Sequence, residues 1–242
     1  QTAAQDIEVL DGDGTSILVV TSDDRSVAVI DDMVKRPLRT GGISRIERTA
    51  SPGIFVGLDN ETTGMALSQL TVTEDGVSAT RSVGNMVDKF FTDIRGEGNV
   101  LISTTGELMD SGALTLRKNL GVEGLPCIEL ARNRFFMFTE KPNEPYGVAV
   151  RVYNAASGAL LENRTVNLPP SATGYGQQRP KEVVRWGTDG FVVLGPGGTI
   201  CFTRQSFPSP APEMRPSGVQ HLTSGTPADS DSDGDGIPAS LE

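Results

Sequence analysis

Residues 147–160, with the sequence Gly-Val-Ala-Val-Arg-Val-Tyr-Asn-Ala-Ala-Ser-Gly-Ala-Leu, hold the pattern that decides the fold. A run of β-branched and aromatic residues leads into a polar turn, and the turn leads into a second strand. The end of this stretch, Ser157-Gly-Ala-Leu160, recurs as Ser111-Gly-Ala-Leu114. The same strand, turn and strand unit surrounds Asp32 and Asp75. The chain is therefore a repeat of one strand-turn-strand unit.

The spacing of these turns indicates the architecture. Turn centres near residues 32, 75, 111 and 157 are separated by roughly 43, 36 and 46 residues, which is typical of a four-stranded propeller blade. We therefore predict an all-β β-propeller with about five blades. Their expected ranges are about 6–41, 43–86, 88–122, 127–169 and 180–206.

Short apolar runs supply the strands of these blades. Each is four to eight residues long and is bounded by Gly, Asp, Asn or Pro, and no long apolar stripe of helical period occurs, so any helix is expected to be a single turn. Because a blade packs against a neighbour on both faces, strands that are apolar throughout are expected. In the third blade, Lys89–Ile94 is predicted as the inner strand. The other predicted strands are Ser16–Val20, Ser26–Ile30, Gly53–Leu58, Asn99–Ser103, Arg134–Phe138, Gly147–Tyr153, Glu182–Trp186, Gly190–Leu194 and Thr199–Thr203.

The charge of the chain excludes several classes of partner. The formal charge of −10 disfavours binding to nucleic acid or to an anionic lipid surface. No apolar run approaches the roughly 20 residues of a membrane helix, so no membrane insertion is expected. The last 14 residues carry −5 of this charge. The acidic excess is therefore concentrated in the tail.

Composition divides the chain into three parts. We predict propeller blades in residues 1–206, a Pro/Ser-rich extended linker in residues 207–228, and a short calcium-binding motif in residues 229–242. The chain begins at Gln1 rather than at Met and stops within an acidic motif. Further domains are therefore expected on both sides of this sequence.

Three segments, read with the hairpin repeats, carry a family resemblance. They are Ala4-Gln-Asp-Ile-Glu-Val-Leu10, Ser26-Val-Ala-Val-Ile-Asp-Asp32 and Val184-Arg-Trp-Gly-Thr-Asp-Gly-Phe-Val192. They resemble the C-terminal blades of secreted bacterial seven-bladed propellers of the YVTN type, although the chain has no YVTN tetrapeptide. The resemblance implies about two further blades upstream of Gln1, which would make this a propeller truncated from seven blades.

The acidic tail matches the ligand spacing of a calcium loop. With Asp231 first, Asp233 stands third, Asp235 fifth, Gly236 sixth and Glu242 twelfth, while the carbonyl of Ile237 stands seventh. Starting at Asp229 instead puts Ser240 twelfth and loses the closing carboxylate. We therefore predict calcium as the cofactor, with metal ligands Asp231, Asp233, Asp235, Ile237 and Glu242. Calcium binding is expected to order residues 229–242.

The tail also resembles a thrombospondin type 3 repeat. The resemblance lies in Asp231-Ser-Asp-Gly-Asp-Gly-Ile-Pro238 and implies that Asp231, Asp233 and Asp235 are ligands. Ala239 departs from the acidic residue usual at its position. This departure implies a water ligand or a weaker site.

Few residues are suited to catalysis. His221 is the only histidine and lies in the predicted linker, which excludes a Ser/His/Asp triad within the blades. Carboxylates in predicted blade loops could pair as acid and base, although turn or surface roles are the commoner use: they are Asp59, Glu61, Asp93 and Glu140. Cys127 and Cys201 are expected to be buried as small apolar residues, with a disulfide as the alternative. No catalytic or cofactor-binding residue is predicted.

The expected function follows from these patterns. The leading hypothesis is a non-catalytic, extracellular or cell-surface propeller that binds a protein or glycan, with a calcium-stabilised C-terminal stalk. The alternative is an enzyme of the propeller lactonase or quinoprotein type, with its site in the central channel. Several Glu, Arg or His residues facing the channel would favour the enzyme, and a small or apolar channel would favour binding. A purely structural spacer is a third possibility.

Overall fold

The computed structural model describes residues 3–10, 15–140, 147–167, 182–187, 190–194, 200–204 and 207. All of these residues belong to one unit, Gln1–Pro210. The predicted metal ligands lie outside the described residues.

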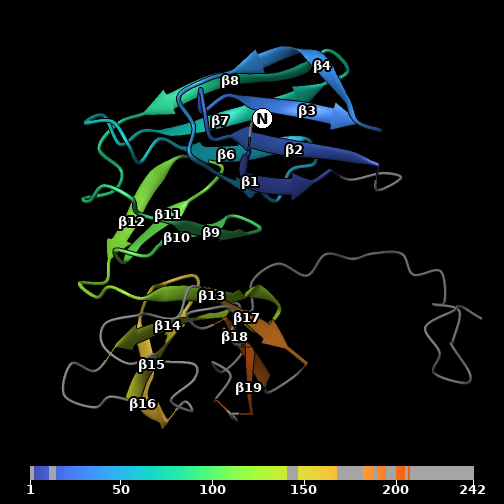
Figure 1. Ribbon diagram of the computed structural model, residues 1–242. Coiled ribbons are helices and arrows are strands. Elements are labelled where there is room, and N and C mark those ends of the chain that lie inside the picture. The colour runs from blue at the N-terminus through green and yellow to red at the C-terminus, as the bar shows by residue number, and fades with distance from the viewer. Residues whose placement is uncertain are drawn as a thin grey trace, which may run out of the picture. The chain divides into compact units, whose positions relative to one another are not determined.

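The described strands form consecutive antiparallel meanders, which follow one another in chain order (Figure 1). We number these meanders from one to five. The first contains β1 (Ala4–Val9), β2 (Ser16–Thr21), β3 (Val27–Asp31) and β4 (Val34–Thr40). The second contains β5 (Arg45–Arg48), β6 (Ile54–Leu58), β7 (Leu67–Thr73) and β8 (Gly76–Val83). The third contains β9 (Ile94–Glu97), β10 (Val100–Ser103), β11 (Glu107–Asp110) and β12 (Thr115–Asn119).

The remaining strands continue the same order. The fourth meander contains β13 (Leu125–Glu129), β14 (Arg134–Glu140), β15 (Gly147–Asn154) and β16 (Leu160–Asn167). The fifth contains β17 (Glu182–Trp186), β18 (Gly190–Leu194) and β19 (Ile200–Arg204). A single 3-10 turn, Leu130–Arg132, is the only helix among the described residues.

The repeated turns of the sequence occupy one position in the fold. The turns near residues 32, 75, 111 and 157 each join the third strand of a meander to the fourth. Equivalent positions in successive meanders explain the period in the sequence. The repeat prediction is therefore confirmed in the first four meanders.

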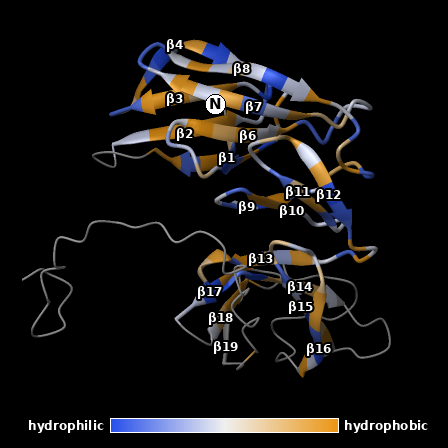
Figure 2. Cartoon of the chain, turned by 180° about the vertical axis from the view of Figure 1, so that it is seen from behind, coloured by the Kyte–Doolittle hydropathy of each residue, from blue (hydrophilic) through white to orange (hydrophobic). Residues whose placement is uncertain are grey.

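Alternate residues of a strand contribute to different hydrophobic cores. In β14, Phe135 and Met137 pack with residues of the third meander, whereas Phe136 and Phe138 pack with residues of the fifth. In β10, Leu101 belongs to the core shared with the second meander, while its neighbours Val100 and Ile102 belong to the core shared with the fourth. Hydrophobic colour accordingly runs along strands such as β2 and β10 in Figure 2. This use of both faces explains why these strands lack polar alternation.

One close contact joins the outer strands of the first two meanders into an eight-stranded sheet. A parallel bridge pairs Leu38 of β4 with Gly76 of β8. A Cβ built on Gly76 would lie 2.0 Å from the carbonyl O of Leu38, and φ at Gly76 is +135°. The approach of β4 to β8 therefore requires glycine at position 76.

The structure corrects one predicted strand. Residues 89–93 form a loop rather than the inner strand of the third meander, and that strand is Ile94–Glu97. The adjacent aromatic residues Phe90 and Phe91 are typical of a strand in sequence, but contacts with the second meander hold them in a loop.

Phe207 extends the packed part of the chain to the start of the expected linker. Its side chain is buried against Phe136 and Phe191, and its carbonyl accepts a hydrogen bond of 2.7 Å from Nη1 of Arg134. The other residues of the expected linker lie outside the described part of the chain.

The arrangement is that of a β-propeller. The first strands of successive meanders lie beside one another, β1 with β5, β5 with β9, β9 with β13 and β13 with β17, and a hydrophobic core fills each interface between meanders. The all-β propeller prediction is confirmed, and the number of blades in the complete domain stays a prediction. No helix in the described residues is long and apolar enough to span a membrane.

Candidate functional site

Charged side chains gather on the first strands of the meanders. Short strands such as Arg45-Ile-Glu-Arg48 and Ile94-Arg-Gly-Glu97 carry charged residues beside apolar or small ones. Because first strands lie beside one another, these charges meet across meanders. We call the resulting group the first-strand cluster: Asp6, Glu8, Arg45, Glu47, Arg48, Asp93, Arg95 and Glu182.

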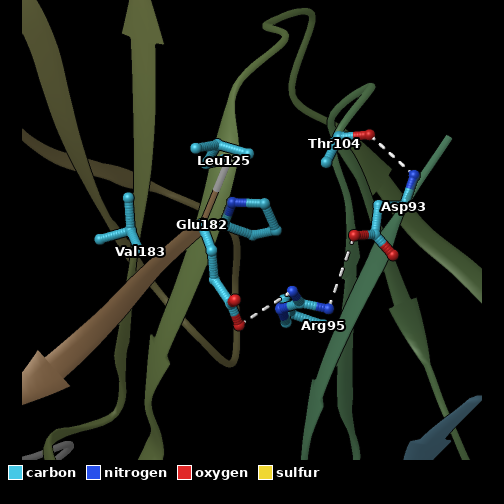
Figure 3. Close-up of a pocket in the computed structure, with 7 residues that line it drawn as sticks. Asp93, Arg95, Thr104, Leu125, Glu182 and Val183 are labelled. Carbon is cyan, nitrogen blue, oxygen red and sulfur yellow. Dashed lines mark hydrogen bonds and ion pairs between the residues drawn. The ribbon is translucent and has the colours of Figure 1, made fainter. Parts of the chain in front are cut away.

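Arg95 contacts several members of this cluster, and Figure 3 shows its guanidinium between the carboxylates of Glu182 and Asp93. Its Nη1 is 3.2 Å from Oε1 of Glu47 and 3.6 Å from Oδ2 of Asp93, and its Nη2 is 3.2 Å from Oε1 of Glu182. Asp93 is itself held because its N–H donates to Oγ1 of Thr104 over 3.0 Å. One guanidinium therefore links three carboxylates from the second, third and fifth meanders.

Glu47 is the most deeply buried member of the cluster, with 7% of its surface exposed. Its Oε2 accepts a hydrogen bond of 2.9 Å from the N–H of Gly96. A Cβ at Gly96 would lie 2.9 Å from the carbonyl O of Arg48, so glycine permits this approach of β9 to β5. Burial raises the pKa of Glu47 from 4.5 to about 8, against the opposing effects of Arg95 and the Gly96 N–H.

The remaining carboxylates of the cluster also have partners. Arg45 Nε lies 3.2 Å from Oδ1 of Asp93, and Arg48 Nε lies 3.3 Å from Oε2 of Glu8. Oδ2 of Asp6 accepts a 2.9 Å hydrogen bond from the N–H of Ile46. Burial raises the pKa of both Asp6 and Glu8. The cluster thus places several carboxylates where ionisation is unfavourable.

A second group of ion pairs surrounds Glu129, the last residue of β13. Its Oε2 is 2.6 Å from Nε of Arg134, and its Oε1 is 3.2 Å from Nη2 of Arg185. Arg134 is 1% exposed and Arg185 lies over the ring of Phe191 at 4.5 Å. These contacts fasten β13, β14 and β17 together, which is a structural role.

Two small cavities adjoin the first-strand cluster. One, of about 10 Å³, is lined by residues that include Arg95, Thr104, Leu125 and Glu182, and it has room for about one water molecule. The other, of about 190 Å³, is bordered by Arg95 and Arg185 and is smaller than the roughly 300 Å³ of typical ligand pockets. Among the described residues, the space beside the cluster therefore consists of one cavity for about one water molecule and one of about 190 Å³.

The carboxylates singled out in the sequence are not brought together. Asp93 joins the first-strand cluster, whereas Asp59 pairs with Arg25 at 3.2 Å and exposed Glu61 accepts a hydrogen bond from Gln5. The side chain of Glu140 lies outside the described atoms. No paired acid and base arises among Asp59, Glu61 and Asp93.

The other predicted sites divide in the same way. Cys127 is free and buried, and burial raises the pKa of its thiol to about 12, which confirms its expected role as a small apolar residue. The side chain of Cys201 and all of His221 lie outside the described part of the chain. No group of three potential metal-binding side chains occurs among the described residues. Asp231, Asp233, Asp235, Ile237 and Glu242 lie beyond those residues, so the calcium site stays a prediction.

Sequence reasoning missed Glu47 and Arg95. Both lie within short strands, Arg95 between Ile94 and Gly96, and Glu47 between Ile46 and Arg48. Charged residues in strands that are otherwise expected to be buried were the available signal for a buried ion pair. Their pairing required knowledge of which first strands become neighbours.

Comparison with known proteins gives likeness of fold only. No family model matches the chain, and no curated protein matches it. Among solved structures, hydrazine synthase of Kuenenia stuttgartiensis is 11% identical with a TM-score of 0.50, and the match covers 83% of this chain and 65% of that one. A protein of unknown function from Desulfotomaculum acetoxidans is 14% identical with a TM-score of 0.54, covering 83% of this chain and 71% of that one. BamB from Moraxella catarrhalis is 10% identical with a TM-score of 0.49, covering 84% and 67%. The chain thus spans less than two thirds of the hydrazine synthase chain.

Proposed function

We propose that this chain is a non-catalytic, extracellular or cell-surface β-propeller that acts as a binding scaffold for a protein or glycan. The observation that supports this proposal is the mutual pairing of the first-strand cluster. Arg95 engages three carboxylates, and the two cavities beside it, of about 10 Å³ and about 190 Å³, are both smaller than the roughly 300 Å³ of typical ligand pockets. Binding is therefore assigned to the loops that the meanders present.

The alternative is a propeller enzyme of the lactonase or quinoprotein type. Glu and Arg residues on first strands are the feature expected for it, and the raised pKa of Glu47 is typical of catalytic acids. Glu47 nevertheless faces Arg95 and Gly96 rather than open space. We therefore retain catalysis as the second candidate function.

Hydrolysis of a simple γ-lactone and binding of pyrroloquinoline quinone by the full chain separate the two functions. The scaffold function predicts no hydrolysis above the uncatalysed rate and no saturable quinone binding. Either activity, abolished by Glu47→Gln in a folded protein, would overturn the scaffold in favour of the enzyme. A glycan array with the same protein then tests for the glycan class of ligand.

We further propose that the tail holds calcium through Asp231, Asp233, Asp235, the carbonyl of Ile237, and Glu242. Carboxylates at the first, third and fifth positions of a twelve-residue loop supply hard oxygen ligands for this cation. Such a loop would stiffen the stalk that follows the propeller.

Isothermal titration of the full chain with Ca²⁺ tests this site. We expect Asp235→Asn to weaken binding at least tenfold, because Asp235 is the fifth-position ligand. Asp229→Asn is the matched control, since Asp229 lies outside the proposed register and its loss leaves affinity unchanged. A flat titration, or a larger effect at Asp229 than at Asp235, contradicts the proposed site.

A further inference from the structure

Two adjacent aromatic side chains are exposed in the loop between β8 and β9. Phe90 is 47% exposed and Phe91 is 79% exposed, with ring centroids 6.4 Å apart and planes inclined at 50°. Burying a Phe side chain is favourable, so this exposure forgoes stabilisation. Paired exposed aromatic residues are typical of interaction surfaces.

The backbone at Phe91 is strained as well. Its φ is +58°, a left-handed conformation that is unfavourable for a residue with a side chain. A bulky aromatic residue is rarely found there. Exposure and strain therefore coincide at one residue, and neither contributes to stability.

Asn60 of the second meander fixes this conformation. The N–H of Phe91 donates to the carbonyl O of Asn60 over 3.1 Å, and Nδ2 of Asn60 donates to the carbonyl O of Thr92 over 2.6 Å. Asn60 is 1% exposed. Oγ1 of Thr92 in turn donates to the carbonyl O of Lys89 over 2.6 Å. The loop is thus preorganised, which lowers the entropy lost when a partner binds.

The surroundings of the aromatic pair are acidic. Asp88 is exposed two residues before Phe90, and exposed Glu61, next to Asn60, has the neutral amide of Gln5 as a partner. Lys89 is paired with Glu123. The described loops at this end of the strands hold seven acidic side chains: Asp23, Asp24, Asp59, Glu61, Asp88, Asp93 and Glu123. Four of the seven are in ion pairs: Asp24 with Arg39, Asp59 with Arg25, Asp93 with Arg45 and Arg95, and Glu123 with Lys89.

We propose that Phe90, Phe91, Asp88 and Glu61 form a docking surface for a protein segment that carries Lys or Arg side chains. A cationic side chain lies against the exposed ring faces and its head group pairs with Asp88 or Glu61, which combines a cation–π contact with charge complementarity. This inference rests on the binding function proposed above and names the partner class. A glycan could stack on the rings, but it would leave the carboxylate charge uncompensated.

Fluorescence anisotropy with the full chain tests this surface. The titrant is a labelled peptide, Gly-Arg-Leu-Arg-Gly-Leu-Arg, with a second peptide in which Glu replaces each Arg. We expect saturable binding of the Arg peptide alone. Phe91→Asn should weaken it at least fivefold without changing protein charge, whereas Asp88→Asn and Glu61→Gln should each weaken it about twofold to threefold.

Leu116→Asn is the matched control, because Leu116 is 51% exposed on β12 and lies outside the acidic loops. The Leu116→Asn variant should bind the Arg peptide with the same affinity as the unaltered chain. Equal binding of both peptides, or equal affinity of Phe91→Asn and Leu116→Asn, overturns the docking surface. Glycan binding that is lost in Phe91→Asn, without binding of the Arg peptide, also overturns it but leaves the scaffold function standing. Lactone hydrolysis without binding of the Arg peptide would contradict both the docking surface and the scaffold function.

Discussion

The first-strand cluster and the loop of Phe90 and Phe91 depart from ordinary residue placement in opposite ways. In the cluster, a carboxylate such as Glu47 is buried, but Arg95 and the Gly96 N–H engage it. In the loop, aromatic rings are exposed, and hydrogen bonds with Asn60 hold Phe91 in a strained backbone conformation. The buried charges of the cluster engage one another, whereas the exposed rings of the loop leave apolar surface available to a partner. This comparison favours binding at the loop over chemistry on the first strands.

The largest effect expected in the cluster is a pH dependence that arises from Glu47. Its folded-state pKa of about 8 lies above its ordinary value of 4.5, so the folded protein retains a proton that the unfolded chain has lost. Between pH 4.5 and 8 the free energy of unfolding should therefore fall, by at most about 5 kcal/mol, and should then level off. The raised pKa values of Asp6 and Glu8 act in the same direction.

Urea unfolding at pH 5, 7 and 9 measures this dependence. Glu47→Gln should flatten it and should raise stability at pH 9 relative to the unaltered chain. If the free energy of unfolding depends on pH in the same way in the variant and in the unaltered chain, Glu47 is ionised across this range. That result would contradict the raised pKa of Glu47.

Arg95→Met should lower the free energy of unfolding by about 3 kcal/mol, because charge-assisted hydrogen bonds to Glu47 and Glu182 are lost. Urea unfolding at pH 7 measures the loss. The control is Arg39→Met, whose ion pair with Asp24 has both side chains about half exposed and should contribute far less to stability. A stability gain in Arg95→Met would instead indicate a strained functional site and would break the comparison.

Asn60→Ala should lower the free energy of unfolding by about 1–2 kcal/mol, because it leaves the carbonyl of Thr92 without its side-chain donor. It should also weaken binding of the Arg peptide although both Phe side chains remain. Asn99→Ala, in the exposed turn before β10, is the control for stability and for binding. Unchanged peptide binding in Asn60→Ala would show that preorganisation of the loop is unimportant.

The smallest effect on stability is expected at Phe91. Phe91→Asn should leave the free energy of unfolding unchanged or raise it by up to about 1 kcal/mol, because Asn tolerates a positive φ. Thermal unfolding by circular dichroism measures this change. In contrast, Phe136→Leu in the packed core should be destabilising. Comparable losses in both variants would mean that Phe91 contributes to folding.

Local patterns predicted much of the fold. Gly190–Leu194 and Glu182–Trp186 are strands with the predicted bounds, and each repeated turn lies between the third and fourth strands of a meander. Period-two packing is a local property, so a single sequence reveals it. The strand expected at Lys89–Ile94 was wrong because Asn60, in another meander, decides that conformation.

The first-strand cluster could not be assembled from the sequence for a similar reason. Arg95 is 48 residues from Glu47 and 87 residues from Glu182 along the chain. Only the order of the meanders brings these three side chains together. Asp93 was recognised as a carboxylate of interest, but its partners Arg45 and Arg95 were not.

Strands whose residues pack into two hydrophobic cores also limit which mutations this protein can tolerate. Deleting one residue from β10 would exchange the residues that face the second and fourth meanders, and both cores would be disrupted at once. Replacing one apolar residue by another preserves the alternation and leaves both interfaces filled. Apolar substitutions should therefore be tolerated within the strands, whereas insertions and deletions should be tolerated only in the turns. The structural neighbours share the fold with this chain at 11% and 14% identity.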